Sequence, residues 1–294
     1  MASSPRRCAH RLNPACCAYV KRLFVSKHVR FAASIAPKGG RRVVPLEDLE
    51  KYRAPALDKG LDILELLAAT EESLSQAEIA KALDRSPNEI YRMLDRLVRR
   101  GFVRRTAADR YEVTLKLFEL AHARPPLQRL LSQAMPVMRR FARDAQQACH
   151  LAIYDRGNLV VAAQVDGPGY WNVSVRVGSR ISLINTGSGH VLLAFAAADE
   201  RRLMLEEQDQ PEQLTPALEE RLTRVRQQGF ENMQSLQIAG VTNLSVPILG
   251  PMGRVLAVFT CPYSERLDVT TAPGCDAALK LLIACGQEIS QRRG

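Results

Sequence analysis

The chain has 294 residues, of which 46% are hydrophobic, and this length is typical of two domains with separate cores. It holds no run of about 18 apolar residues, so the sequence predicts no membrane-spanning helix. The net charge of +10 gives no argument for a nucleic-acid partner, because ten of the 41 basic residues lie in residues 1–42, which lack Asp and Glu, and the rest of the chain is balanced.

Residues 1–42 form a basic tail that does not resemble a domain. The tail has no sustained apolar period and is interrupted by Pro and Gly, and Met1 is its only methionine. We favour the interpretation that it is a start-site artefact, with translation beginning at a non-Met codon near Val43 or Val44. A disordered arm that adds nonspecific phosphate affinity and a targeting peptide are the two alternatives.

Residues 55–112 carry the pattern of a small helical domain. Leu57, Leu61 and Leu64 are spaced as one apolar stripe, which predicts a first helix, and "QAEIAKAL" predicts a short second helix. Asp84 occupies the turn that follows, where a residue that tolerates a left-handed backbone is needed. The chain then reads "SPNE", in which the first Ser is a helix cap and Glu89 completes a capping box.

The third helix is amphipathic, and a two-stranded wing follows it. Its apolar residues lie on one face, and most of its charged residues lie on the other. Gly101 ends the helix, and "RGFVRRTAADRYEV" reads as strand, polar turn and strand. Residues 85–110 contain eight Arg against three Asp and Glu, so this segment is a local basic patch. The order predicts a winged helix-turn-helix.

Arginine and asparagine on an exposed recognition helix are suited to guanine and adenine edges, and arginines on a wing are suited to phosphates or the minor groove. A solvated helix in a protein-binding winged domain is the alternative. The predicted DNA-binding residues are Ser86, Asn88, Tyr91, Arg92, Arg96, Arg104, Arg105 and Arg110.

The remainder of the chain predicts a linker helix over 113–124 and an α+β domain over 125–294. Pro125 and Pro126 separate the linker from a longer helix and form a candidate hinge. We expect a hairpin over 149–165, a third strand over 170–177, helices over 188–198 and 217–228, a hairpin around residues 250–253, and a closing helix.

The segment "NTGSGHVLLAF" is a candidate anion site. Free amide N–H groups at a helix start, together with the helix dipole, are suited to a small carboxylate. An ordinary glycine-rich turn is the alternative. The segment lacks the Lys of a phosphate-binding loop, and Ser188 does not lie in a GxSxG elbow, so the pattern does not favour an enzyme.

The sequence has seven cysteines and five histidines. The spacing of the cysteines does not match a disulfide framework, and the spacing of the histidines does not match a zinc site. The sequence therefore predicts a reduced, cytoplasmic setting, and it predicts no metal and no cofactor.

With both regions in place, the chain resembles the IclR family of bacterial transcriptional regulators over about residues 55–292. The likeness rests on "ALDKGLDILELLA", "LSQAEIAKAL", "YRMLDRLVRRGFV", "YEVTLKLFELA", "RVGSRISLINTGSGHVLLA" and "GVTNLSVPILGPMGRVLAVFT". The resemblance implies a winged helix-turn-helix joined by a linker helix to a GAF-like effector-binding domain. It also implies homodimers or dimers of dimers, a palindromic operator in double-stranded DNA, an organic or aromatic acid effector, and no catalysis.

Carried over by position, the resemblance places the effector at a loop and on two strands. The implied effector-binding residues are Gly187, Ser188, Gly189, Asn243, Phe259 and Cys261.

The chain departs from the family pattern at three places near this loop. His190 stands where Lys is common, Ser182–Leu183–Ile184 replaces a common Pro-Leu-His, and Glu231 stands alone where an acidic pair is common. Phe259 also replaces a commonly polar residue. These changes predict a larger or less polar effector. The main functional alternative is a protein–protein adaptor whose GAF-like domain senses no ligand.

Overall fold

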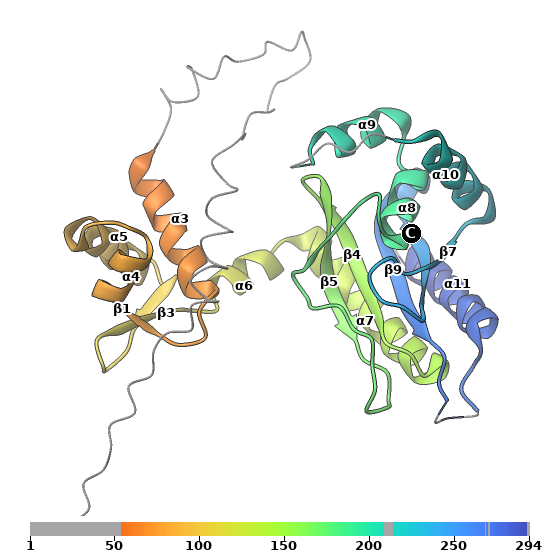
Figure 1. Cartoon of the computed structure of the whole chain (residues 1–294), viewed down its shortest axis with the longest axis horizontal. Coiled ribbons are helices and arrows are strands. Elements are labelled where there is room, and N and C mark those ends of the chain that lie inside the picture. Colours follow the sequence, from red (N-terminus) through yellow and green to blue (C-terminus); the bar gives the residue numbers. More distant parts are fainter. Residues whose placement is uncertain (1–53, 209–213, 268, 270, 293–294) are drawn as a thin grey trace, which may run out of the picture. The chain divides into compact units, whose positions relative to one another are not determined.

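The computed structural model describes residues 54–208, 214–267, 269 and 271–292. The predictions for the tail over 1–42 lie outside these residues. The chain divides into two compact units, and the division lies between Ala121 and His122. Figure 1 shows a helical unit with a small sheet and a larger unit built around a single sheet.

The N-terminal unit is a winged helix-turn-helix, as the sequence predicts. A three-stranded antiparallel sheet in the order β1-β3-β2 packs with three helices around one apolar cluster, which includes Ile63, Ile79, Ile90 and Leu94. The elements are α3 (Pro55–Ala68), β1 (Leu74–Ser75), α4 (Gln76–Ala82), α5 (Pro87–Arg99), β2 (Val103–Arg105) and β3 (Arg110–Val113).

Local side-chain caps fix the two helices of the helix-turn-helix. Ser75 begins α4 and Ser86 begins α5, each in a complete capping box with the Glu three residues later. Asp84 has a φ of 52° in the turn between them, which confirms the left-handed position expected there. Glu89 also pairs with Lys59 of α3 at 2.6 Å, so the cap joins two helices.

Two further helices follow the wing. The first is α6 (Lys116–His122), which has no buried residue. The second is α7 (Pro125–Ala145), in which the two prolines are the first residues of the helix, where their missing N–H groups leave no bond unmade. Gln146 ends α7 in a left-handed conformation.

The C-terminal unit contains a six-stranded antiparallel sheet in the order β6-β5-β4-β9-β8-β7. Its strands are β4 (Cys149–Asp155), β5 (Asn158–Val165), β6 (Arg180–Ile181), β7 (Glu231–Gln234), β8 (Val241–Leu249) and β9 (Val255–Ser264). The four remaining α-helices described are α8 (Gly187–Phe195), α9 (Ala198–Glu206), α10 (Pro216–Gln228) and α11 (Cys275–Gln291).

One expectation for this unit is wrong, and one helix was not expected. Residues 170–177 form no strand, although their side chains alternate, because the edge of β5 pairs instead with the two-residue strand β6. Tyr170 and Trp171 are exposed there at 83% and 72%. Helix α9 was not predicted.

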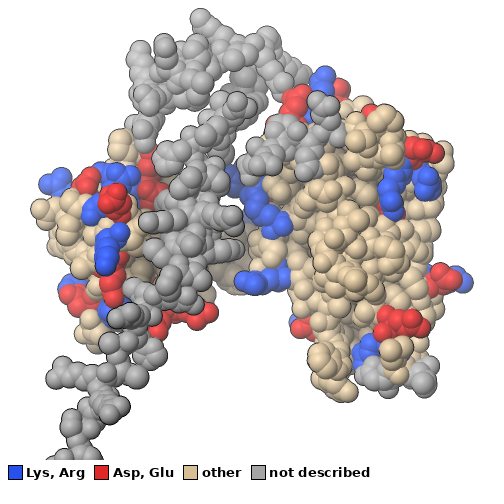
Figure 2. Space-filling view, viewed as in Figure 1, with Lys and Arg blue, Asp and Glu red and all other residues tan. Residues whose placement is uncertain are grey.

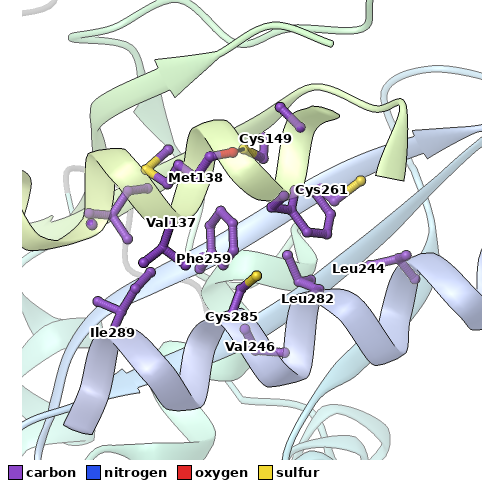
Figure 3. Close-up of a cluster of buried hydrophobic side chains, with 14 of the residues drawn as sticks. Val137, Met138, Cys149, Leu244, Val246, Phe259, Cys261, Leu282, Cys285 and Ile289 are labelled. Carbon is purple, nitrogen blue, oxygen red and sulfur yellow. Dashed lines mark hydrogen bonds between the residues drawn. The ribbon is translucent and has the colours of Figure 1, made fainter. Parts of the chain in front are cut away.

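The sheet has helices on both faces. One face packs on α7 and α11 through a cluster that includes Val137, Phe141, Phe259 and Leu282 (Figure 3). The opposite face packs on α8, α9 and α10 through a cluster that includes Ala152, Val258 and Leu192. The described helices include none that is long and apolar enough to cross a membrane.

We expect Phe259→Ala to lower the free energy of unfolding by about 3–5 kcal/mol, because Phe259 is fully buried and its ring contacts Phe141 at 5.4 Å between centroids. Urea unfolding of the purified protein measures this change. Tyr170→Ala removes an exposed ring of similar size and should change stability by less than about 0.5 kcal/mol. Equal effects of the two substitutions would contradict the packing described for β9.

Candidate DNA-binding surface and effector site

The exposed face of α5 carries the central residues predicted to contact DNA. Asn88, Tyr91, Arg92 and Arg96 are all exposed, whereas Ile90 and the other apolar residues turn inward. Among the described residues, neither Arg92 nor Arg96 has an acidic partner within salt-bridge distance. These two guanidinium groups are therefore free to donate to a ligand on this face.

The three arginines of the wing differ in their contacts. Arg104 and Arg105 are exposed and pair with Glu112 and Asp109 on the same hairpin. Arg110 instead pairs with Glu78 at 2.9 Å and donates to the Ser73 carbonyl at 2.8 Å.

Arg110 therefore ties the wing to the start of α4, which makes it the least available of the three for DNA. Figure 2 shows acidic side chains interspersed among the basic ones on the visible face of this unit.

Helix α8 begins at the predicted glycine–serine loop, and its first eight residues are buried. Thr186 caps the helix, because its hydroxyl accepts from the Gly189 amide at 3.1 Å and donates to the Ser182 carbonyl at 2.7 Å. The first amides of a helix have no acceptor within it. In the described part of the chain, the amides of Gly187 and Ser188 remain without one. Of the three amides expected to hold an acid, Gly189 is thus already occupied.

Steric contacts explain why glycine occupies positions 187 and 189 of the loop. A Cβ at Gly189 would lie 2.0 Å from the Leu183 carbonyl oxygen, so only glycine fits there. A Cβ at Gly187 would lie 3.2 Å from Ser245 Oγ and 3.4 Å from Asn243 Cβ. The start of α8 therefore lies directly on β8, and the structure brings Asn243 next to the loop.

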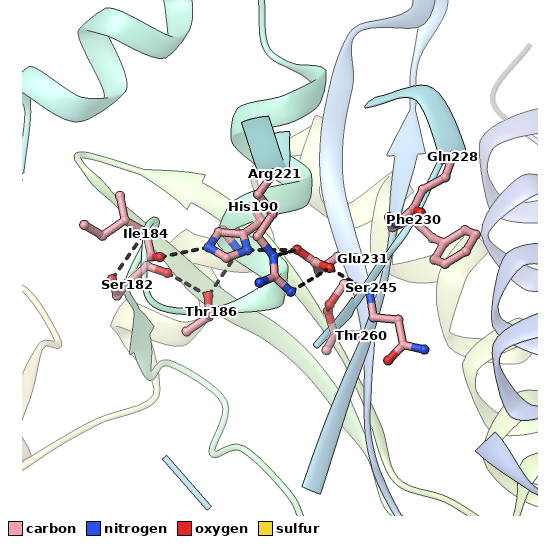
Figure 4. Close-up of polar contacts among 12 residues, drawn as sticks. Ser182, Ile184, Thr186, His190, Arg221, Gln228, Phe230, Glu231, Ser245 and Thr260 are labelled. Atoms are coloured by element: carbon pink, nitrogen blue, oxygen red, sulfur yellow. Dashed lines mark hydrogen bonds and ion pairs between the residues drawn. The ribbon is translucent and has the colours of Figure 1, made fainter. Parts of the chain in front are cut away.

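A buried ionic network joins the loop to two other elements (Figure 4). His190 Nδ1 lies 2.9 Å from Glu231 Oε2 on β7, and Arg221 of α10 donates to both oxygens of Glu231. His190 Nε2 lies 2.8 Å from the Ile184 carbonyl oxygen. Both ring nitrogens of His190 therefore face a protein oxygen.

The network connects the departures from the family pattern. His190 and Ile184 stand at positions that differ from the family pattern, and Glu231 is the acidic residue that remains of the common pair. His190 contacts both of the others. The unusual histidine thus has its own acceptors inside the fold.

The expectation for Phe259 and Cys261 is wrong. Both side chains lie in the apolar cluster between the sheet and the helices α7 and α11, on the face away from α8 (Figure 3). Burial raises the pKa of the Cys261 thiol well above its usual value. The residue between them, Thr260, faces α8, and its hydroxyl lies 2.9 Å from Ser188 Oγ.

Phe259 therefore no longer supports the inference of a less polar effector, because it does not face the loop. The signal that marks Thr260 is a polar residue in the middle of the apolar run of β9.

The Glu231 network should make stability depend on pH. Burial raises the pKa of Glu231, but hydrogen bonds from His190 and Arg221 outweigh burial and hold it at about 2. A depressed carboxyl pKa stabilises the fold above the unfolded-state value, and this stabilisation is lost as the pH falls. We expect Glu231→Gln to be less stable at pH 7 by up to about 3 kcal/mol, with the difference shrinking between pH 5 and pH 2.

Urea unfolding at a series of pH values measures this difference. Asp199→Asn provides the control, because that carboxylate is 92% exposed and should show no such gap. If the difference in the free energy of unfolding between the parent and Glu231→Gln stays constant down to pH 2.5, the charge of Glu231 does not contribute to that difference.

Comparisons with known proteins agree with this architecture. The model of the IclR helix-turn-helix domain matches residues 56–107, and the model of the bacterial transcriptional regulator IclR C-terminal domain matches residues 127–291. The HTH-type transcriptional regulator KdgR of Escherichia coli is 28% identical over 81% of this chain and 96% of that protein. The HTH-type transcriptional repressor AllR of E. coli is 25% identical over 73% of this chain and 82% of that protein.

Solved structures give the same fold. The Thermotoga maritima IclR structure covers 82% of this chain and 99% of its own, with a TM-score of 0.66 at 22% identity. Pseudomonas aeruginosa HmgR covers 82% of this chain and 100% of its own, with a TM-score of 0.65 at 25% identity. KdgR and AllR are named as a transcriptional regulator and a transcriptional repressor, and not as enzymes. With both of its domains matched in order, the chain belongs to the IclR family of DNA-binding transcriptional regulators.

Proposed function

We propose that this protein is a cytoplasmic, sequence-specific regulator whose binding to a palindromic operator is controlled by a small organic or aromatic acid. The observation that carries the proposal is that one chain has two candidate binding surfaces. One is the exposed face of α5 with Arg92 and Arg96, and the other is the start of α8 with two free amides. The first is suited to DNA edges, and the second is suited to a carboxylate.

Exposed leucines support a homodimer. Leu57 and Leu61 on α3 are exposed at 61% and 48%, and Leu115, Leu117 and Leu120 at α6 are exposed at 74%, 44% and 52%. Apolar side chains gathered on two helices in this way are typical of a surface that a second copy covers. A dimer would present two α5 helices to a symmetric operator, and the same family organisation allows a dimer of dimers.

Control by the effector would be a population shift. An acid that binds one conformation of the C-terminal domain better than another changes the balance between them, and α6 would transmit that change to the spacing of the two wings. The size of the response is limited by the difference between the two affinities.

Arg92→Ala should weaken operator binding by about tenfold to a hundredfold while leaving the fold intact, because a bidentate arginine contact to a base contributes about 1–3 kcal/mol. The operator is first recovered by capture of genomic fragments, and affinity is then measured by fluorescence anisotropy at fixed salt. Arg202→Ala on α9 removes the same charge from the other domain and serves as the control. If no fragment is enriched, or if Arg92→Ala binds as the parent does, the protein–protein adaptor becomes the better interpretation.

Asn243→Ala should weaken binding of the effector acid by about tenfold, because an amide beside the loop can donate to the carboxylate. Thermal shifts with a panel of organic acids identify the ligand, and calorimetry gives its affinity. The neighbouring Thr242 pairs with Gln234 and points to the other side of the strand, so Thr242→Ala is the matched control. Equal affinities of the two variants would remove Asn243 from the site.

A further inference from the structure

A row of polar side chains crosses the sheet under the start of α8. Residues directly opposite one another on paired strands point to the same face of a sheet, and five such residues follow one another across five strands. We call this set the polar row. Its members are Gln164 on β5, His150 on β4, Thr260 on β9, Ser245 on β8 and Glu231 on β7.

The polar row faces the effector site. Thr260 Oγ1 lies 2.9 Å from Ser188 Oγ, and it donates to Ser245 Oγ at 2.9 Å (Figure 4). Glu231 of β7 bonds to His190, which lies on α8 as Ser188 does. Two residues along the strands, Ala152 and Val258 form an apolar layer with α8 instead. The polar side chains are thus concentrated where α8 begins.

One member of the row is not satisfied. His150 is 3% exposed, and neither of its ring nitrogens has a hydrogen-bond partner among the described residues. By contrast, Gln164 donates to Val165 and Asp166, and Glu231 has three donors. A buried polar group without a partner destabilises the fold, so its presence calls for an explanation in function.

The charge state of His150 restricts what could bind it. Burial lowers the pKa of His150 to about 4, so the ring is neutral at neutral pH and offers one donor and one acceptor. Its neighbours in the row are the Gln164 amide and the Thr260 hydroxyl, and His190 and Arg221 are already bound to Glu231 at the far end. This end of the row therefore suits a neutral polar group better than a second carboxylate.

We propose that His150 is a further effector-binding residue, which hydrogen-bonds a hydroxyl group of an acid whose carboxylate lies at the amides of Gly187 and Ser188. The effector class is then a hydroxycarboxylic acid. This inference rests on the proposed function, because it needs the α8 start to bind an acid. It adds a residue and a chemical selectivity that the glycine–serine loop alone does not provide.

The test compares matched acids that differ by one hydroxyl group, using the full chain. The pairs are butyrate and 4-hydroxybutyrate, succinate and malate, and benzoate and 4-hydroxybenzoate. We expect the parent protein to bind the hydroxylated member of at least one pair about tenfold more tightly by calorimetry. His150→Leu should abolish that preference, and His150→Gln should retain part of it, because the amide keeps a donor and an acceptor.

A second readout separates binding from a structural role. Without any acid, His150→Leu should unfold at the same temperature as the parent or higher, since it replaces two unpartnered nitrogens with a buried apolar side chain. Ser290→Ala is the control. It removes a half-buried hydroxyl that bonds Leu249 and Gly286, so it should lower the unfolding temperature and leave the preference unchanged.

The outcomes are distinguishable. If the parent binds acids but shows no hydroxyl preference, or if His150→Leu keeps that preference or unfolds at a lower temperature, the role of His150 is overturned and the acid-controlled regulator stands. If the parent binds none of the acids tested, the effector part of the proposed function fails, and the role of His150 fails with it.

Discussion

The C-terminal domain depends on one close approach, in which glycines let the start of α8 lie against β8 and against the loop that precedes the helix. Gly189 lies against the Leu183 carbonyl, and Gly187 lies against Ser245 and Asn243. This approach buries the first amides of the helix, and buried amides need acceptors. Thr186 satisfies one of them, and those of Gly187 and Ser188 have no acceptor among the described residues. The same constraint therefore determines the packing of this helix and provides the two amides on which the proposed anion site rests.

Charge inside the domain is arranged around that helix start. A glutamate buried on β7 is neutralised by Arg221 and His190, which hold its pKa near 2. His190, which stands where Lys is common in the family pattern, contacts both Glu231 and the Ile184 carbonyl oxygen. The proposed effector site is left with neutral groups, namely Ser188, Thr260 and His150. A site with this composition is suited to hydrogen-bond recognition in addition to the attraction of a carboxylate.

Local signals predicted the N-terminal domain well. A cap and its partner lie three residues apart, so "SPNE" fixes the start of α5 wherever the domain is folded, and the left-handed Asp84 follows from the turn alone. The exposed face of α5 follows from the period of its apolar residues. Arg110 could not be assigned in this way, because its partners Glu78 and Ser73 are more than thirty residues away along the chain.

The sequence by itself determined the family, the order of the two domains, the capped recognition helix and the glycine–serine loop. Only the tertiary structure decided which face each strand presents. In β9 every residue from Val255 to Tyr263 except Leu256 is buried, so alternation in the sequence cannot distinguish Phe259 and Cys261 from Thr260. The neighbouring helices make that distinction, since α7 and α11 cover one face and α8 covers the other. His150 was missed for the same reason: a buried polar residue becomes recognisable only when every group around it has been placed.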